Sequence, residues 1–266
     1  MKDNKEICLE VTKLTSIVGK FILEERKKFN DSFIEKKGHN DIVSYVDKQS
    51  EEMLVAELKI ILPEAGFITE ENTSLSRGPI YNWIIDPLDG TTNFIHGMPI
   101  FCISIGLMKE NEMVIGVVHE LNLSECFYGW KNGGAYLNGE RIFVSSIQKL
   151  SDSLLATGFP YHNYDRMKPY MEIFDYCMRN THGLRRLGSA AADLAYVACG
   201  RFEGFYEYGL NSWDVAGGVL LVREAGGIVT DFSGTDNFIF GEEVIATNAH
   251  IANEFLYVVK TKIGAA

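Results

Sequence analysis

The sequence predicts an α/β (α+β) fold in which layers of helices and sheets alternate, because helical and strand patterns both run through the chain. Up to Pro63 the apolar residues recur at the spacing of helices, and from Gly66 to Trp130 they form short runs typical of strands. Beyond residue 150 the two patterns alternate. No linker or change of composition interrupts the chain, so we expect one domain over residues 1–266. It would combine a helix pair and an antiparallel sheet at about 1–150 with an α/β layer at about 151–266.

Two helices open the chain. The apolar residues of the first recur every three or four positions, at Ile7, Val11, Leu14, Val18 and Phe21 or Ile22. This spacing places them on one buried face. A second helical pattern runs from about Asp47 to Ile61, and Pro63 ends it because proline cannot continue a helix. Asp47 is therefore expected near the N-terminus of the second helix.

The strands and the remaining helices follow from shorter patterns. Strands are predicted at Gly66–Thr69, Asn82–Asp86, Phe101–Met108, Met113–His119 and Cys126–Trp130. Residues 129–139 are dense in Gly and Asn and predict the turns of an antiparallel region. The second half predicts strands at 154–158, 202–208 and 227–231, helices at 167–178, 189–199 and 213–225, and a last strand and helix beyond Glu243.

Composition excludes several classes of protein. The formal net charge of -11 argues against broad cationic binding of nucleic acid or of an anionic membrane. The cysteines are scattered and form no Cys-x-x-Cys pair, so neither a disulfide framework nor a zinc site is expected. The first residues lack the apolar core of a signal peptide, and no apolar run is long enough to span a bilayer. We therefore expect a cytoplasmic protein.

The most informative segment is Asp86-Pro87-Leu88-Asp89-Gly90-Thr91-Thr92. A strand is predicted to end at Asp86, since Pro87 cannot donate to a ladder, and Gly90-Thr91-Thr92 would turn into a helix. The two carboxylates then flank a bend and can converge. The free amides of the following helix terminus suit a phosphate group. Taken alone, however, the motif could also be an ordinary turn or a helix N-cap.

Further acids occupy similar ends of predicted elements: Asp47, the pair Glu70-Glu71, and Asp214 in Trp213-Asp214-Val215-Ala216-Gly217-Gly218. Two carboxylates ~4 Å apart repel by roughly 4 kcal/mol at an effective dielectric of ~20. Converging acids therefore need a cation or raised pKa values. Hard oxygen ligands select Mg2+, Mn2+ or Ca2+, and Mg2+ is the usual partner of a substrate phosphate. The histidines are scattered and are expected at the surface or in the core.

These segments resemble those of the inositol monophosphatase family in its bacterial form. The matching stretches are Asn40-Asp41-Ile42-Val43, Glu70-Glu71, Asp86–Asn93, Gly188-Ser189-Ala190-Ala191 and Trp213–Gly218. The resemblance covers nearly the whole chain and implies a layered αβαβα sandwich of the sugar-phosphatase type. It also implies hydrolysis of a small phosphate monoester, above all inositol 1-phosphate, by metal-activated water. A homodimer, lithium sensitivity and a small phosphorylated polyol or sugar as substrate are further implications.

The resemblance also implies roles for individual residues. Glu70, Asp86 and the Leu88 carbonyl would hold one Mg2+, while Asp86, Asp89 and Asp214 would hold a second, with Glu70 also near a third, weaker site. Mn2+ could replace Mg2+, whereas Ca2+ or Li+ would inhibit. The catalytic residues would be Asp47, Glu70 and Thr91, with Thr91 and Asp47 orienting and deprotonating the water. The substrate would contact Glu70, Leu88, Asp89, Gly90, Thr91, Thr92, Gly188, Ser189, Ala190, Glu207 and Asp214.

Two alternatives stay open. The superfamily uses one metal site for 3'(2'),5'-bisphosphate nucleotides, fructose 1,6-bisphosphate and histidinol phosphate as well, and the metal motif does not separate these substrates. Thr69, where many members have Gly, and residues 95–98 depart from the family pattern, which puts the shape of the pocket in doubt. The other alternative is a non-catalytic regulatory protein with this fold. The complete set of carboxylates argues against it.

Overall fold

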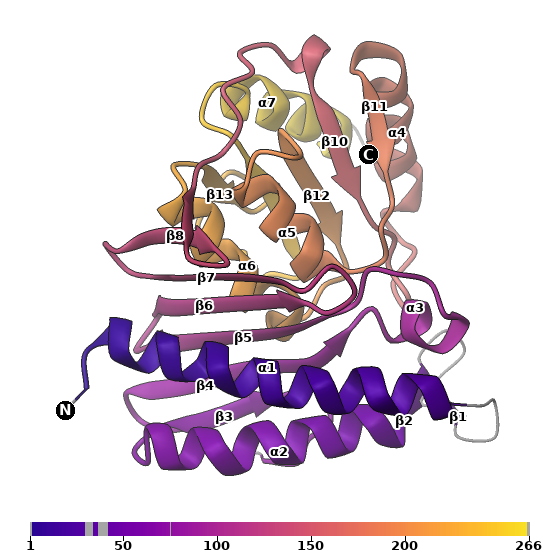
Figure 1. Cartoon of the computed structure of the whole chain (residues 1–266). Helices are drawn as coiled ribbons and strands as arrows, with labels where there is room; N and C mark the ends of the chain where they lie inside the picture. The colour runs from indigo at the N-terminus through magenta and orange to yellow at the C-terminus, as the bar shows by residue number, and fades with distance from the viewer. Residues whose placement is uncertain (1, 30–33, 37–41, 75, 265–266) are drawn as a thin grey trace.

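The computed structural model describes residues 2–29, 34–36, 42–74 and 76–264, and its helices and sheets alternate in five layers (Figure 1). The first layer holds α1 (Asn4–Lys28) and α2 (Tyr45–Ile61), which cover a seven-stranded sheet. The middle helices, α5 (Ala190–Ala198) and α6 (Ser212–Glu224), separate it from a five-stranded sheet. The predicted αβαβα sandwich is confirmed. Asn40 and Asp41 of the quoted motifs lie outside the described residues.

The first two helices form where the apolar spacing predicts them. In α1 the predicted apolar positions are buried, with Ile22 rather than Phe21 fully inside. Helix α2 begins two residues before the predicted start because Ser44 caps it, and Asp47 completes the capping box as the third helical residue. This places the Asp47 carboxylate at the N-terminus of α2, where the helix dipole favours negative charge.

The seven-stranded sheet holds its strands in chain order. They are β3 (Gly66–Thr69), β4 (Tyr81–Asp89), β5 (Cys102–Lys109), β6 (Glu112–Glu120), β7 (Glu125–Trp130), β8 (Gly134–Leu137) and β9 (Glu140–Ile142). β3 pairs parallel with β4, and the later neighbours pair antiparallel. Residues 129–139 contain the predicted turns, but they also contain β8, which the sequence did not indicate.

Strand β4 corrects one prediction, since it continues past Asp86 to Asp89. Asp86 lies opposite Ser104 and Asp89 opposite Cys102, so β4 contains one residue more than β5 over this stretch. Pro87 falls within this bulge, where its missing N–H group removes no regular ladder bond. Because Ser104 and Cys102 are two residues apart, they share a face. The bulge therefore brings Asp86 and Asp89 to the same face of the sheet.

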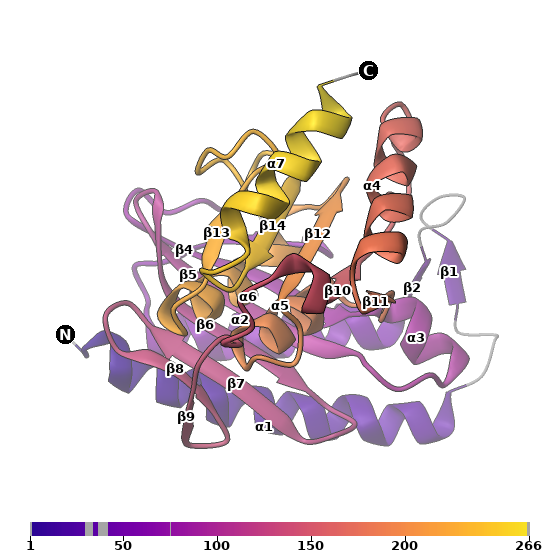
Figure 2. The ribbon, with the colours of Figure 1, turned by 90° about the horizontal axis from the view of Figure 1, so that it is seen from above.

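The five-stranded sheet has the order β11-β10-β12-β14-β13. Its strands are β10 (Leu154–Thr157), β11 (Gly183–Arg185), β12 (Gly204–Tyr208), β13 (Ile228–Thr230) and β14 (Glu243–Thr247). Figure 2 shows α4 (Met167–Asn180) and α7 (Ala252–Ile263) on the outer side of this sheet. Short elements that the sequence did not indicate are β11, β9, β1 (Ile34–Lys36) and β2 (Ile42–Ser44), whereas α3 (Thr91–His96) begins where Gly90-Thr91-Thr92 predicted a helix start. No described helix is long and apolar enough to cross a membrane.

The paired glycines of α6 explain how closely the middle layer packs. A Cβ atom on Gly217 would lie 2.7 Å from the Ser104 hydroxyl oxygen on β5. A Cβ atom on Gly218 would lie 2.4 Å from Cβ of Leu194 on α5. Neither position has room for a side chain. Helix α6 can therefore approach both the seven-stranded sheet and α5, and its N-terminus, which carries Asp214, lies beside the end of β4.

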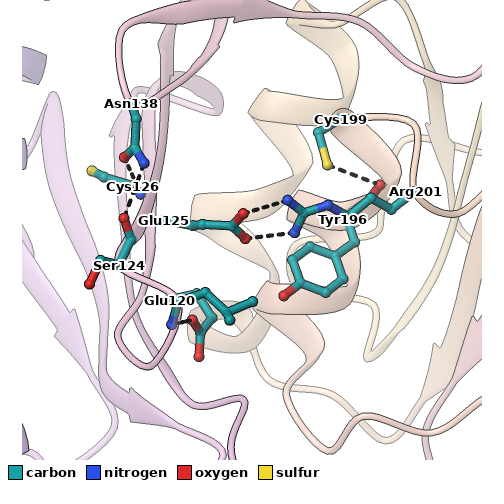
Figure 3. Close-up of polar contacts among 9 residues, drawn as sticks. Glu120, Ser124, Glu125, Cys126, Asn138, Tyr196, Cys199 and Arg201 are labelled. Atoms are coloured by element: carbon teal, nitrogen blue, oxygen red, sulfur yellow. Dashed lines mark hydrogen bonds and ion pairs between the residues drawn. The ribbon is translucent and has the colours of Figure 1, made fainter.

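An ion pair fastens the C-terminal end of α5 to the seven-stranded sheet (Figure 3). Arg201 donates two hydrogen bonds to the Glu125 carboxylate on β7, one of them 2.6 Å long between Nη1 and Oε2. The guanidinium also lies over the ring of Tyr196, 4.5 Å from its centroid. Bidentate pairing of this kind fixes orientation as well as position. The opposite end of α5 is thereby directed toward the end of β4.

Candidate active site

The predicted metal and substrate residues line one cleft of about 330 Å³ between the two sheets. They are Glu70, Asp86, Leu88, Asp89, Gly90, Thr91, Thr92, Gly188, Ser189, Ala190, Glu207 and Asp214. Residues from β4, α3, α5, β12 and α6 therefore meet at one place. Asp47 is not on the wall of the cleft itself, but its carboxylate contacts Thr91 from behind.

Thr91 and Asp47 form a hydrogen-bonded pair at the edge of the cleft. The Thr91 hydroxyl oxygen lies 2.9 Å from Oδ1 of Asp47 and 3.0 Å from the Leu88 carbonyl oxygen, so it can donate its single proton to either. The backbone N–H and the hydroxyl of Ser44 donate to the other Asp47 oxygen, at 2.9 and 2.6 Å. Burial raises the pKa of Asp47, and these hydrogen bonds partly offset the rise.

Glu70 and Asp86 share the most crowded part of the cleft. Their carboxyl groups lie close together, and burial raises the pKa of both well above the ordinary range, with the charges of the neighbouring acids adding to it. One Asp86 oxygen accepts from the Leu88 N–H at 2.9 Å. Two carboxyl groups in this arrangement hold a proton between them unless a cation replaces it.

Asp89 is held from behind by the N-terminus of α5. Its Oδ2 accepts one hydrogen bond from the Ser189 hydroxyl and one from the Ala191 N–H, each 2.7 Å long. Burial nevertheless raises the pKa of Asp89 to about 6. The sequence indicated Ser189 only as a substrate contact, whereas its hydroxyl group is also engaged with Asp89.

Asp214 approaches the same point from α6. It accepts a hydrogen bond of 2.6 Å from the Asn211 N–H as part of the cap of this helix. Burial and then the nearby Asp89 raise its pKa to about 7. The negative charge of Asp214 thus repels those of the other acids of the cleft, although Asp214 lies far from them in the sequence.

The donor set fits hard divalent cations. Among the described residues, no three His, Cys, Asp or Glu side chains already stand in the arrangement of a closed metal site. Several carboxylate oxygens instead accept hydrogen bonds from the protein, as at Asp89 and Asp214. Burial nevertheless raises the pKa of Glu70, Asp86, Asp89 and Asp214. The negative charges of their ionised forms are therefore not fully compensated by the protein. Oxygen ligands in need of positive charge suit Mg2+ or Mn2+.

Two residues that support the site were given no role by the sequence, although one of them, Asn93, ends the quoted motif Asp86–Asn93. Glu51 of α2 accepts hydrogen bonds from Glu71 and Thr73 and so holds the loop that carries Glu70. Asn93 donates to the carbonyl oxygens of Ile100 and Leu187, tying α3 to the segment before α5. Both act through loops that only the fold brings together.

Other residues on the wall of the cleft were not predicted: Asn72, Thr157, Gly158, Tyr161, His162, Arg186, Asp193, Gly209, Leu210, Asn211 and Trp213. His162 is exposed, as expected, and it also lines this cleft. Arg186 is the single Lys or Arg on the wall within the described part of the chain. A basic residue in an Arg-Arg pair is ordinarily a solvated surface feature, so the sequence offered no reason to choose it.

Comparisons with known proteins agree with this geometry. The sequence model of the inositol monophosphatase family matches residues 3–262. The chain is 40% identical over 230 residues to inositol-1-monophosphatase of Mesorhizobium japonicum, with 86% of each protein covered. It is 41% identical over 221 residues to Nus factor SuhB of Escherichia coli K12, with 83% of each covered. Thermotoga maritima IMPase superposes with a TM-score of 0.87 at 35% identity, over 96% of this chain and 97% of that one.

Proposed function

This chain belongs to the inositol monophosphatase family, and we propose that it is a divalent-metal-dependent phosphatase whose preferred substrate is inositol 1-phosphate. One observation carries the proposal. Four acids, the buried Asp86 and Asp89 and the partly buried Glu70 and Asp214, line one cleft whose edge holds the hydrogen-bonded pair of Thr91 and Asp47. A site for binding alone would not require a basic group paired with a hydroxyl beside such a set of acids.

The acids divide into two sets of metal ligands in this proposal. Glu70, Asp86 and the Leu88 carbonyl would hold one Mg2+, and Asp86, Asp89 and Asp214 would hold a second, while Glu70 would also lie near a third, weaker site. When bound, the cations supply positive charge for the phosphate oxygens and the leaving alcohol and make a water molecule more acidic. The hydrogen bonds from Ser189 and Ala191 keep one oxygen of Asp89 fixed, which orients the other.

Thr91 and Asp47 would position the attacking water and accept its proton. If the Leu88 carbonyl binds a cation, the Thr91 hydroxyl has Asp47 as its remaining acceptor. The oxygen of Thr91 can then accept a hydrogen bond from water, and the proton can pass to the Asp47 carboxylate. Ser44 keeps that carboxylate in place through two hydrogen bonds. Water, and not a side chain, is the nucleophile in this scheme.

The remaining walls would hold the phosphate and the alcohol. The amides of Gly90, Thr91 and Thr92 lie where β4 turns into α3, and we assign the phosphate oxygens to them. Gly90 has a φ of 94° there, a backbone conformation that favours glycine. Ser189, Ala190 and Glu207 line the same cleft, and we assign the released alcohol to them.

Other substrates and one other class remain candidates. The same metal arrangement would serve a bisphosphate nucleotide, fructose 1,6-bisphosphate or histidinol phosphate. Relatives named Nus factor SuhB are about as similar to this chain as those named inositol-1-monophosphatase, so identity does not choose between a regulatory and a catalytic role. The presence of every proposed ligand together with Thr91 and Asp47 supports catalysis.

A panel of these phosphate esters, assayed with Mg2+ and with EDTA, tests the proposal. We expect inositol 1-phosphate to give the highest kcat/KM, and phosphate release to require the cation. The Asp89→Asn variant should lose activity by at least about 100-fold. Fast release in EDTA, or near-normal activity of Asp89→Asn, would contradict the metal site. A much better turnover of another ester would contradict the substrate alone.

A further inference from the structure

A buried carboxyl group that receives no hydrogen bond from the described residues lies on the wall of the cleft. Asp193, in the first turn of α5, is only 1% exposed. Its Oδ1 has no partner, and among the described residues nothing donates a hydrogen bond to this side chain. Burying a carboxyl group in this way costs free energy unless a donor reaches it. Because Asp193 lines the cleft, a ligand in the cleft can supply that donor.

Glu207 adds a second carboxyl group on the same wall. It comes from β12, is 8% exposed, and likewise receives no hydrogen bond from the described part of the chain. A Cβ atom on Gly158 would lie only 2.0 Å from Oε2 of Glu207, so the carboxylate rests directly against the backbone of this glycine. The electrostatic effect of Glu207 on Asp193 indicates that the two acids are close.

Arg186 provides the positive charge at this part of the cleft. It is exposed at the mouth, and its Nη2 donates a hydrogen bond of 3.2 Å to the Tyr161 hydroxyl. It interacts electrostatically with both Glu207 and Asp193, without a hydrogen bond to either. The carboxyl groups of Asp193 and Glu207, which receive no hydrogen bond from the described residues, therefore lie in the same part of the cleft as the Arg186 guanidinium, which only donates.

Hydroxyl groups match this mixture better than other polar groups do. A hydroxyl donates one hydrogen bond and accepts others, so neighbouring hydroxyls can satisfy carboxylates and a guanidinium together. An ammonium group only donates, so it could satisfy the two carboxylates but could not accept a hydrogen bond from Arg186, whose charge also repels it. We propose that Asp193 and Arg186, beside Glu207, form a subsite that selects alcohols carrying neighbouring hydroxyl groups. This inference rests on the proposed phosphatase function and makes Asp193 and Arg186 determinants of its specificity.

A matched pair of substrates tests the subsite. Inositol 1-phosphate and cyclohexyl phosphate present the same six-membered ring and the same ester, but only the first has hydroxyl groups. The quantity to measure is the ratio of their kcat/KM values with Mg2+ present. We expect Asp193→Asn and Arg186→Gln each to lower this ratio about tenfold or more, mainly through KM for inositol 1-phosphate.

Asp175→Asn and Arg179→Gln are the matched controls, because these residues form an exposed ion pair on α4. They should leave the ratio unchanged. The ratio is insensitive to the fraction of folded enzyme, so it remains informative if Asp193→Asn folds poorly, and Arg186→Gln changes an exposed residue. An unchanged ratio in the two cleft variants, or equal losses on both substrates, would overturn the subsite.

Phosphoethanolamine is the third substrate, because it carries an ammonium group. If Asp193→Asn lowers its kcat/KM while leaving that of inositol 1-phosphate intact, the subsite recognises an amine and the assignment to hydroxyls is wrong. A wild-type enzyme that hydrolyses none of the three esters with Mg2+ would instead contradict the proposed function, and the subsite with it. The two failures are therefore distinguishable.

Discussion

The hydroxyl oxygen of Thr91 lies 2.9 Å from Oδ1 of Asp47, although the two residues are 44 positions apart. The capping box of α2 fixes Asp47 through Ser44, and the end of β4 fixes Thr91. Neither residue depends on a ligand for its position. The pair is therefore preorganised for proton transfer, and the predictions below begin with it.

Removing either member of this pair should lower turnover without removing the metal site. We expect Thr91→Val and Asp47→Asn to reduce kcat by about 100- to 10,000-fold, the usual contribution of general base catalysis. Thr91→Ser keeps the hydroxyl and should stay within about tenfold of the wild type. Steady-state kinetics measures the loss, and calorimetric titration with Mg2+ should show binding intact. Equal losses in Thr91→Ser and Thr91→Val would contradict the proposed role of the hydroxyl, because keeping it would then not preserve activity.

Mg2+ should stabilise the folded protein. A cation that binds only the folded state adds about 2.7 kcal/mol to the free energy of unfolding at 100 times its Kd. Asp89→Asn removes a buried carboxylate and should reduce this gain, because a ligand is lost. Thermal unfolding with EDTA and with increasing Mg2+ measures the effect. Asp175→Asn, in an exposed ion pair, should respond as the wild type does; a full Mg2+ response in Asp89→Asn would count against its role as a ligand.

Without metal, the stability of the protein should fall as pH rises from about 4 to about 7. Folding raises the pKa of Asp89 from an ordinary value of 3.8 to about 6 and that of Asp214 to about 7. In that window the folded state binds more protons than the unfolded state, so the free energy of unfolding decreases with pH. Asp89 should account for about 1 to 3 kcal/mol.

Urea unfolding in EDTA at several pH values measures this slope. Asp89→Asn should flatten it, since the group no longer titrates. Mg2+ should reverse the trend, because the cation competes with protons for the same oxygens and binds the ionised groups. A metal-free wild type whose stability rises steadily between pH 4 and 7 would be inconsistent with buried, proton-binding acids in the cleft.

The ion pair of Arg201 and Glu125 should contribute to stability and not to chemistry. Arg201→Lys keeps the charge but loses the bidentate geometry and the stacking on Tyr196, so we expect a loss of about 1 kcal/mol in the free energy of unfolding. Arg179→Lys, in an exposed pair within α4, should cost less than about 0.5 kcal/mol. Urea unfolding compares the two, and a similar small cost in both would show that the link between α5 and β7 is dispensable.

Gly158→Ala should impair recognition of the alcohol more than stability. The added Cβ would lie within 2.0 to 2.2 Å of the Glu207 carboxylate, which must then move. Because the end of a flexible side chain moves, the fold should survive. We expect KM for inositol 1-phosphate to rise several-fold with little change in the Mg2+ dependence. Glu207→Gln provides the comparison: if it raises KM while Gly158→Ala does not, the contact with Gly158 does not hold Glu207 in place.

The layered fold was predictable because its signals are local. Apolar spacing within single segments identified α1, α2, and the strands from β3 to β7, with boundaries shifted by a few residues. Short strands such as β11 and β1 lacked such a signal because three residues are too few to show a period. The extension of β4 was missed for a different reason, since Pro87 normally ends a ladder and only the pairing with β5 reveals the bulge.

The acids of the site were predictable as residue types, and the fold determined what each one contacts. Asp86, Asp89 and Asp214 stand in short motifs whose composition already points to a cation. The contact of Asp89 with Ser189 joins residues 100 positions apart, and the lack of a partner for Asp193 Oδ1 among the described residues depends on everything packed around it. Amino-acid order encodes periodicity and motif chemistry, because both are properties of neighbouring residues. Burial, hydrogen-bond partners and the raised pKa values arise only when distant segments pack and exclude water.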